Sequence, residues 1–223
     1  MSEKYAIIVA GGSGSRMKSE MPKQFLLLGG IPILVRTLQT FLSIENLQVI
    51  LVLPQDSIAY WQNIKGDYFT ENHKIITVMG GNTRFQSVRN GLNSISDQEG
   101  LVAVHDGVRP FISKEIIENS FLVAGQKGSA VVAVDSKDSV RLMKNEKNRA
   151  VDRNTVKLIQ TPQTFDLGLL KKAFLTDEKP FFTDDASVVE YFGHEIFLVE
   201  GDYRNIKITT PEDILIGETF LRM

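Results

Sequence analysis

The sequence predicts an α/β fold, in which a doubly wound, mostly parallel sheet is covered by helices and a β-arm protrudes. Short apolar runs alternate with segments that have apolar residues at helical spacing, which is typical of repeated β–α units. Several of these runs are apolar at successive positions, as parallel strands buried on both faces are. One polar segment, residues 135–155, breaks the alternation and predicts the arm.

The alternation divides the chain into short strands and longer helices. We expect strands at Ala6–Ala10, Val49–Pro54, Ile75–Met79, Leu101–His105, Ala130–Val134 and Ile196–Val199. We expect helices at Ile33–Ile44, Ser57–Lys65, Arg84–Ser94, Lys114–Lys127, Leu167–Phe174 and Pro211–Leu221, the last with Thr210 as its N-cap. A chain of 223 residues is long enough for one large domain, so residues 1–223 are predicted to form a single domain.

The predicted arm comprises Asp135–Thr155. Strand patterns at Ser139–Met143 and around Ala150–Val151 flank a turn at Lys144–Asn148, as in a β-hairpin. A solvated loop without function is the alternative interpretation.

Composition restricts the class of protein. The formal net charge of −2 argues against a dedicated nucleic-acid binder, which normally has a basic excess. The absence of cysteine excludes disulfides, thiolate catalysis and cysteine-ligated metals. The N-terminus lacks the pattern of a secretory signal, and no apolar run approaches the length of a membrane span. We therefore expect a cytoplasmic protein without nucleic-acid or membrane partners.

The first predicted strand leads into a glycine-rich loop followed by cations. Gly11, Gly12 and Gly14 let the backbone approach a ligand closely, and Arg16 and Lys23 follow within the same segment. Exposed backbone N–H groups together with two cations suit a polyphosphate. A tight strand–helix turn with surface cations is the alternative.

Two common glycine motifs do not fit this loop. Met17 occupies the third glycine position of the dinucleotide-binding fingerprint, and Ile33–Thr37 offers no carboxylate for a ribose. The Gly-Lys-Ser/Thr triplet of the ATP-binding P-loop is also absent. The remaining G-x-G-x-R-M…P-K pattern resembles the signature loop of nucleotidyltransferases that make sugar-nucleotide-like products.

A second glycine-containing loop, Gly80–Val88, also follows a strand and opens a helix. Gly80 and Gly81 can let a flat base approach the backbone, while Asn82 and Ser87 offer hydrogen bonds to the edge of that base. A plain helix start capped by Asn82 or Thr83 is the alternative, and the two interpretations are compatible.

A third loop, His105–Phe111, places Asp106 and Arg109 at the end of a strand. The carboxylate could bind substrate hydroxyls or a divalent ion, and an ion pair that stabilises the turn is the alternative. We interpret His105 as a semi-buried structural histidine. Because all three loops follow strands of a parallel sheet, they are expected to meet at one edge.

A last group of candidates is spread along the second half of the chain. Arg153 and Lys207 would bind the phosphate of an acceptor, and Ser139 and Thr183 could donate hydroxyl hydrogen bonds to it. Asp184 and Asp185 are interpreted as carboxylates at the start of a helix, where the helix dipole favours them.

Considered together, the motifs cover nearly the whole chain: AGGSGSRM…PKQF, GGNTRFQSV, HDGVRPF, KDSV, VDRN, QTPQTF, TDDAS and VEGDYRNIKITTPED. In this order they resemble the 2-C-methyl-D-erythritol 4-phosphate cytidylyltransferases of the non-mevalonate isoprenoid pathway. The resemblance implies a Rossmann-like sheet, CTP and a phosphorylated polyol as substrates, and Mg²⁺ held mainly by the CTP phosphates, with no protein metal ligand assigned. It also implies a homodimer joined through an exchanged arm, with Ser139 and Arg153 acting in the partner's site.

By motif position, the resemblance assigns a role to each candidate. The nucleotide would contact Ala10, Gly11, Gly12, Gly14, Gly81, Asn82, Ser87 and Asp106. The acceptor would contact Asp106, Arg109, Ser139, Arg153, Thr183 and Lys207, and the catalytic cations would be Arg16, Lys23, Arg153 and Lys207. Asn82 stands where many relatives have aspartate, and Ser139 where threonine is usual; both keep the ability to form hydrogen bonds.

The expected reaction is in-line attack of the acceptor phosphate on the α-phosphorus of CTP, which displaces pyrophosphate. A phosphomonoester dianion is a competent nucleophile, so no general base is required. Two alternatives stay open: a ribitol-5-phosphate cytidylyltransferase, and a non-catalytic, nucleotide-binding regulatory protein.

Overall fold

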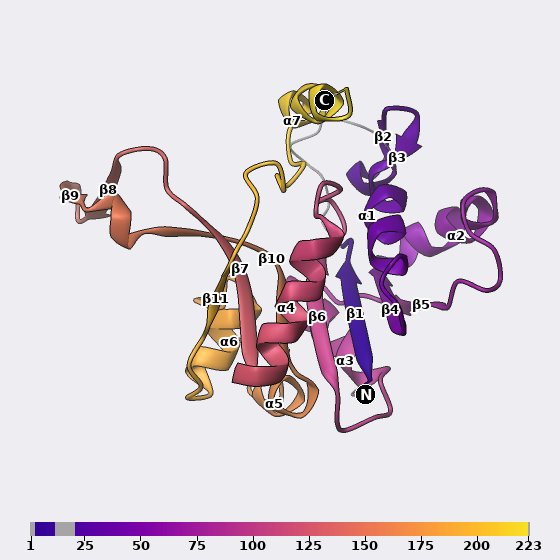
Figure 1. Ribbon diagram of the computed structural model, residues 1–223, viewed down its shortest axis with the longest axis horizontal. Helices are drawn as coiled ribbons and strands as arrows, with labels where there is room; N and C mark the ends of the chain where they lie inside the picture. The colour runs from indigo at the N-terminus through magenta and orange to yellow at the C-terminus, as the bar shows by residue number, and fades with distance from the viewer. Residues whose placement is uncertain (1–2, 12–20, 223) are drawn as a thin grey trace.

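Seven strands form the central sheet in the order β11-β7-β10-β6-β1-β4-β5 in the computed structural model, which describes residues 3–11 and 21–222 (Figure 1). They are β1 (Lys4–Val9), β4 (Leu47–Leu53), β5 (Ile75–Met79), β6 (Leu101–Asp106), β7 (Ser129–Asp135), β10 (Lys157–Asp166) and β11 (Leu198–Glu200). Every neighbouring pair is parallel except the two that β10 makes with β6 and β7. The predicted α/β fold with a mostly parallel sheet is confirmed.

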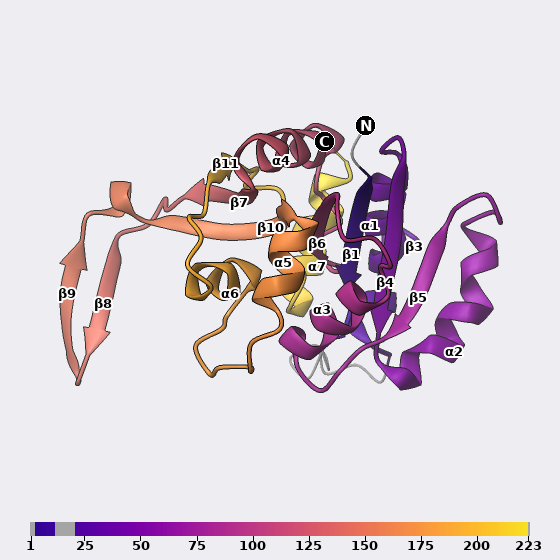
Figure 2. The same ribbon diagram turned by 90° about the horizontal axis from the view of Figure 1, so that it is seen from below.

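Helices cover both faces of this sheet (Figure 2). On one face lie α1 (Ile33–Leu42), α2 (Gln55–Ile64) and α4 (Lys114–Lys127), and their apolar side chains share a core with β1 and β4. On the other face lie α3 (Arg84–Asn93), α5 (Leu167–Ala173) and α6 (Asp185–Tyr191), which form a second core with the same strands. The sheet is therefore doubly wound, as the sequence predicts.

The predicted strands and helices agree with the observed ones to within two residues at each end. The last helix, α7 (Pro211–Phe220), has Thr210 as its N-cap, and the Asp213 carboxylate accepts a hydrogen bond of 2.8 Å from the Thr210 N–H. This reciprocal capping explains why the helix begins where the sequence predicts.

Sequence reasoning missed strand β10 and the small ribbon formed by β2 (Leu27–Leu28) and β3 (Ile31–Pro32). Pro162 lies in the middle of β10, and proline argues against a central strand because it cannot donate to the ladder. The sheet accommodates it by a register shift between Ile159 and Gln163 against β7. The antiparallel direction of β10 was consequently not predicted either.

The polar segment forms a hairpin of β8 (Val140–Lys144) and β9 (Lys147–Val151) that extends away from the sheet (Figures 1 and 2). Asn145 and Glu146 make its two-residue turn, both with positive φ, as a type I′ hairpin turn requires. The protruding arm is confirmed, with a shorter turn and a longer second strand than predicted. In the described part of the chain, no helix is both long and apolar enough to cross a membrane.

Candidate active site

A cavity of about 430 Å³ opens where β1, β5 and β6 end. Because parallel strands end at the same edge, the loops that follow them meet there. The cavity is lined by eight of the residues singled out in the sequence: Ala10, Gly11, Lys23, Gly81, Asn82, Ser87, Asp106 and Lys207. We call it the strand-end pocket. Gly12, Gly14 and Arg16 lie outside the described residues.

Two glycine segments form one wall of the strand-end pocket. The Ser87 hydroxyl accepts a hydrogen bond of 3.1 Å from the Gly81 N–H and lies 3.6 Å from the place that a Cβ on Gly11 would occupy. A Cβ on Gly81 would come within 2.3 Å of the Gln86 Cβ, so only glycine fits there. Thr83 caps helix α3, since its hydroxyl accepts from the Gln86 N–H at 3.1 Å. The capping interpretation is thus confirmed, and both glycine segments line the cavity.

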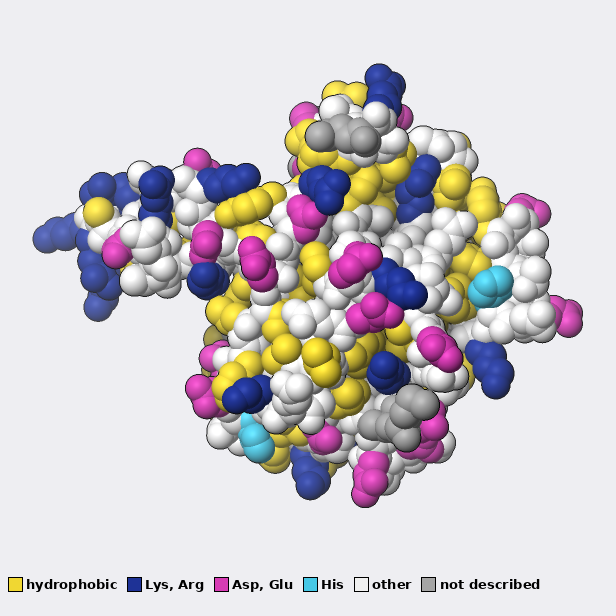
Figure 3. Space-filling view, viewed as in Figure 1, with side chains coloured by type: hydrophobic (Ala, Val, Ile, Leu, Met, Phe, Trp, Pro, Cys, Tyr) yellow, Lys and Arg dark blue, Asp and Glu magenta, His cyan; other side chains and the backbone are white. Residues whose placement is uncertain are grey.

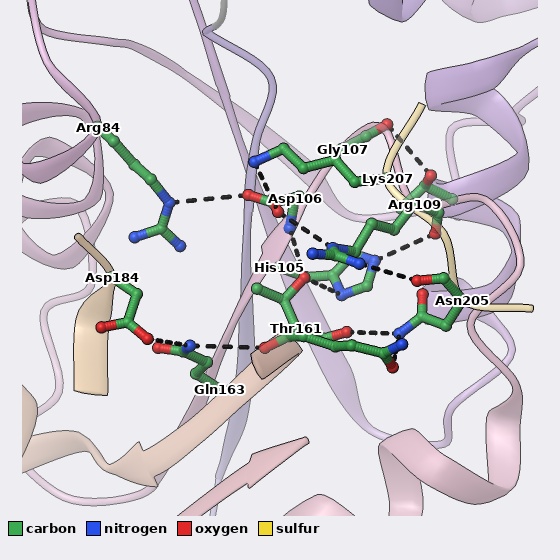
Figure 4. Close-up of polar contacts among 12 residues, drawn as sticks. Arg84, His105, Asp106, Gly107, Arg109, Thr161, Gln163, Asp184, Asn205 and Lys207 are labelled. Carbon is green, nitrogen blue, oxygen red and sulfur yellow. Dashed lines mark hydrogen bonds and ion pairs between the residues drawn. The ribbon is translucent and has the colours of Figure 1, made fainter. Parts of the chain in front are cut away.

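Asp106, at the end of β6, lies at the centre of a cluster of cations (Figure 4). Its Oδ2 is 3.0 Å from Lys207 Nζ and 3.2 Å from Arg109 Nε, and its Oδ1 is 3.7 Å from Arg84 Nε. Burial by itself raises the pKa of Asp106, but the charges of Arg84, Lys207 and Arg109 outweigh burial and hold that pKa far below its ordinary value. The carboxylate is ionised and the cluster has excess positive charge.

His105 is fully buried and cannot act as a base in the pocket. His105 Nε2 lies 3.3 Å from the Arg109 carbonyl, which can only accept, so Nε2 carries the ring proton. In the neutral ring Nδ1 is then an acceptor, and the Thr161 hydroxyl donates to it at 3.0 Å while accepting from the Asp106 N–H at 3.0 Å. Burial lowers the pKa of His105 to about 3, which keeps the ring neutral. The structural interpretation of His105 is confirmed.

Sequence reasoning missed Arg84, which lines the same pocket. Its guanidinium forms a bidentate pair with the fully buried Asp185, at 2.9 and 2.7 Å, in addition to its contact with Asp106. Asp185 does lie in the first turn of α6, as predicted, but the prediction was incomplete because its side chain also pairs with Arg84 of another helix. Asp184 does cap α6, accepting from the Ser187 N–H at 2.9 Å. An arginine at the first position of a helix, directly after a strand-end loop at this edge, was the available signal.

Four further predicted residues do not line the strand-end pocket. Arg109 donates from Nε to Asp106 Oδ2 at 3.2 Å and from Nη1 to the Asn205 carbonyl at 2.8 Å. Thr183 lies in a small adjacent depression that shares Arg84 with the pocket. Ser139 and Arg153 belong to the arm, where Arg153 donates to the Lys137 carbonyl at 3.1 Å. One chain alone therefore does not bring the arm residues to this site.

The family comparison identifies the class of enzyme to which the chain belongs. The sequence profile of IspD, 2-C-methyl-D-erythritol 4-phosphate cytidylyltransferase, matches residues 5–223. The chain belongs to this family. Membership makes the protein a nucleotidyltransferase and confirms the resemblance seen in the motifs.

Individual IspD relatives agree over the full length. The protein of this name from Bacteroides fragilis is 47% identical over 218 residues, which cover 97% of this chain and 98% of the relative. The one from Phocaeicola vulgatus is 46% identical over 220 residues, covering 98% and 99%. The crystal structure of 4-diphosphocytidyl-2C-methyl-D-erythritol synthase from Anaerococcus prevotii is 32% identical, with a TM-score of 0.86 and coverage of 100% of this chain and 97% of that one.

Proposed function

We propose that the strand-end pocket transfers a cytidylyl group from CTP to 2-C-methyl-D-erythritol 4-phosphate, forming 4-diphosphocytidyl-2-C-methyl-D-erythritol and pyrophosphate. The observation that supports this site is the joining of a glycine wall to a cluster with excess positive charge around Asp106. Two anionic reactants repel each other, and this cluster lowers the cost of bringing them together.

Each part of the pocket has a distinct task in this proposal. The glycine wall with Asn82 and Ser87 holds the cytidine, and Lys23 neutralises the triphosphate together with Arg16. Lys207, held by Asp106, orients the acceptor phosphate for in-line attack on the α-phosphorus, together with Arg153 from the arm. Catalysis then consists of positioning and charge stabilisation.

The reaction proceeds without a general base. The acceptor phosphate is a dianion near neutral pH, so its oxygen attacks without losing a proton. The new P–O bond forms as the bond to pyrophosphate breaks, and the negative charge leaves with the pyrophosphate. This fits a pocket whose described lining contains no histidine, His105 being buried behind it and held neutral.

Nucleotidyltransferases generally use a divalent metal ion, and we propose Mg²⁺ for this one. Among the described residues, no group of three or more acidic or histidine side chains could hold a metal. Mg²⁺ would be bound mostly by phosphate oxygens of the nucleotide, and Asp106, which lines the pocket, is the candidate protein carboxylate. When bound, the ion would neutralise charge on the triphosphate.

We further propose a homodimer in which each arm completes the partner's site. The arm is an isolated two-stranded hairpin, a structure that is marginally stable in water. Leu142 and Met143 are 48% and 68% exposed on it, and lysines and arginines cover much of its visible surface (Figure 3). Contact with a second copy would bury the apolar side chains and bring Ser139 and Arg153 to the partner's acceptor phosphate.

We place the reaction in the cytoplasm, on the sequence argument given above. A ribitol-5-phosphate cytidylyltransferase and a non-catalytic regulatory protein were the alternatives. The relatives described above all have the name of the same enzyme, and nothing in the pocket favours either alternative.

The test is an assay of pyrophosphate release by the purified protein with Mg²⁺. CTP, UTP, ATP and GTP are each combined with 2-C-methyl-D-erythritol 4-phosphate or with ribitol 5-phosphate. We expect release with CTP and methylerythritol phosphate only. Release with ribitol phosphate in preference would establish the first alternative, and CTP binding without release with any acceptor would establish the second.

A further inference from the structure

Gln24, in the strand-end pocket, is a buried polar side chain without a hydrogen-bond partner among the described residues. It lies in the short 3₁₀ turn Lys23–Phe25, directly after the proposed triphosphate lysine, and it lines the pocket. The residue is 1% exposed, and neither its Nε2 nor its Oε1 has a hydrogen-bond partner among the described residues. Leaving a carboxamide buried in this way is unfavourable, since water has been removed and nothing replaces it.

The two other glutamines that the described part of the chain buries are fully satisfied. Gln163, also 1% exposed, donates to Asp184 Oδ2 at 2.8 Å and accepts from the Ala186 N–H at 2.9 Å. Gln160 donates to the Asp202 carbonyl at 2.9 Å and accepts from Asn205 at 3.0 Å. The fold therefore provides partners for both of these glutamines. Among the buried amides of the described residues, Asn205 lacks a partner at Oδ1 alone, whereas Gln24 lacks one at both polar atoms, which needs a reason.

We propose that Gln24 is a nucleotide-binding residue whose carboxamide is satisfied by bound CTP. This inference rests on the proposed function of the pocket. An amide has both donors and an acceptor, so Nε2 donates to an oxygen of the nucleotide, while Oε1 can accept from a hydroxyl or a backbone N–H that nucleotide binding brings within reach.

The proposal predicts opposite effects on stability and on binding. Gln24→Met keeps approximately the shape of the side chain and removes its polar atoms. The free protein should therefore become more stable, with its thermal midpoint raised by about 2 °C or more. Affinity for CTP should fall about tenfold or more, because the hydrogen bond to the nucleotide is lost.

Gln163→Met is the matched control, since it places the same side chain at an equally buried glutamine that is fully bonded. It should lower the thermal midpoint, because it removes the hydrogen bonds that Gln163 makes to Asp184 Oδ2 and to the Ala186 N–H, and CTP affinity should stay within a few-fold of the parent. Both quantities are measured by thermal unfolding without ligand and by titration calorimetry with CTP as the probe.

The outcomes separate the two proposals. A Gln24→Met protein with a raised midpoint and weakened CTP binding supports the assignment. A midpoint lowered as in Gln163→Met, or CTP binding equal to that of the parent, overturns it and leaves the proposed function intact. A parent protein that does not bind CTP would overturn the proposed function and the assignment together.

Discussion

Lys207 Nζ lies 3.0 Å from Asp106 Oδ2, joining the segment before α7 to the end of β6. The same carboxylate also pairs with Arg109 of its own loop and with Arg84 at the start of α3, so one buried side chain links α3, the end of β6 and the segment before α7. Asp106 keeps cations close together that would otherwise repel each other. This arrangement leads to the first two predictions.

Asp106→Asn should destabilise the protein and slow the reaction. The amide keeps the shape of the side chain but leaves Lys207 and Arg109 without their carboxylate partner and Arg84 with Asp185 alone, at a cost of about 2 kcal/mol or more. Urea unfolding at pH 7 measures this. Glu118→Gln removes one partner of the exposed Lys114–Glu118 pair and should change stability by less than about 1 kcal/mol. Equal effects of the two substitutions would show that the cluster does not need Asp106.

Lys207→Ala should raise the KM for the acceptor about tenfold or more while leaving the KM for CTP within a few-fold, because Lys207 orients the attacking phosphate. Its side chain is 39% exposed, so stability should change little. Steady-state kinetics with each substrate varied in turn distinguish the two constants. Lys114→Ala, on the surface of α4, is the control and should match the parent. An equal rise in the KM for the acceptor and the KM for CTP would show that Lys207 does not act specifically on the acceptor.

Lys23→Ala should lower kcat by about 10²–10³, the loss typical of removing a donor that stabilises developing negative charge. Lys23 is 9% exposed in the strand-end pocket, whereas Lys65 is exposed at the end of α2 and provides the control in Lys65→Ala. Single-turnover measurements with saturating CTP report the chemical step directly. A kcat within a few-fold of the parent would refute the role assigned to Lys23.

The exchanged arm predicts complementation between two inactive variants. In a heterodimer of Arg153→Ala and Lys23→Ala subunits, one site combines the body of the Arg153→Ala subunit, which has Lys23, with the arm of the Lys23→Ala subunit, which has Arg153. This site has both native residues, and the other site has neither. Random reassociation of equal amounts gives half heterodimers, each with one native site of two, so about a quarter of the parent activity should return. If mass spectrometry detects heterodimers but the mixed sample regains no activity, each arm serves its own chain.

His105 should make stability fall as the pH decreases from 6.5. Its pKa is lowered to about 3 in the folded protein, whereas an unfolded chain takes up the proton near 6.5. Between these values the unfolded state binds more protons, so stability is lost with decreasing pH, by at most about 1.4 kcal/mol per pH unit.

Urea unfolding of the parent and of His105→Gln between pH 7.5 and 5 tests this. The variant lacks the titrating ring, so any deficit in its stability at pH 7.5 should shrink as the pH falls. A deficit that stays constant across this range would mean that His105 does not supply the pH dependence.

The sequence by itself determined the alternation of strands and helices, the arm and the loops that form the strand-end pocket. These depend on local features: runs of apolar residues, caps such as Thr210, and glycine where a Cβ does not fit, as at Gly81. Parallel strands end at one edge, so even the meeting of the loops followed from the pattern.

Only the tertiary structure decided which charges pair and which polar groups have no partner. Asp185 reads locally as a helix-start carboxylate, yet it is buried against Arg84, about a hundred residues earlier in the chain. Strand β10 was missed because Pro162 argues against a strand. Pairing with β6 on one side and β7 on the other nevertheless makes this segment a strand. The unpartnered carboxamide of Gln24 has no sequence signature. Such features depend on long-range packing, which determines the distance between side chains and their access to water.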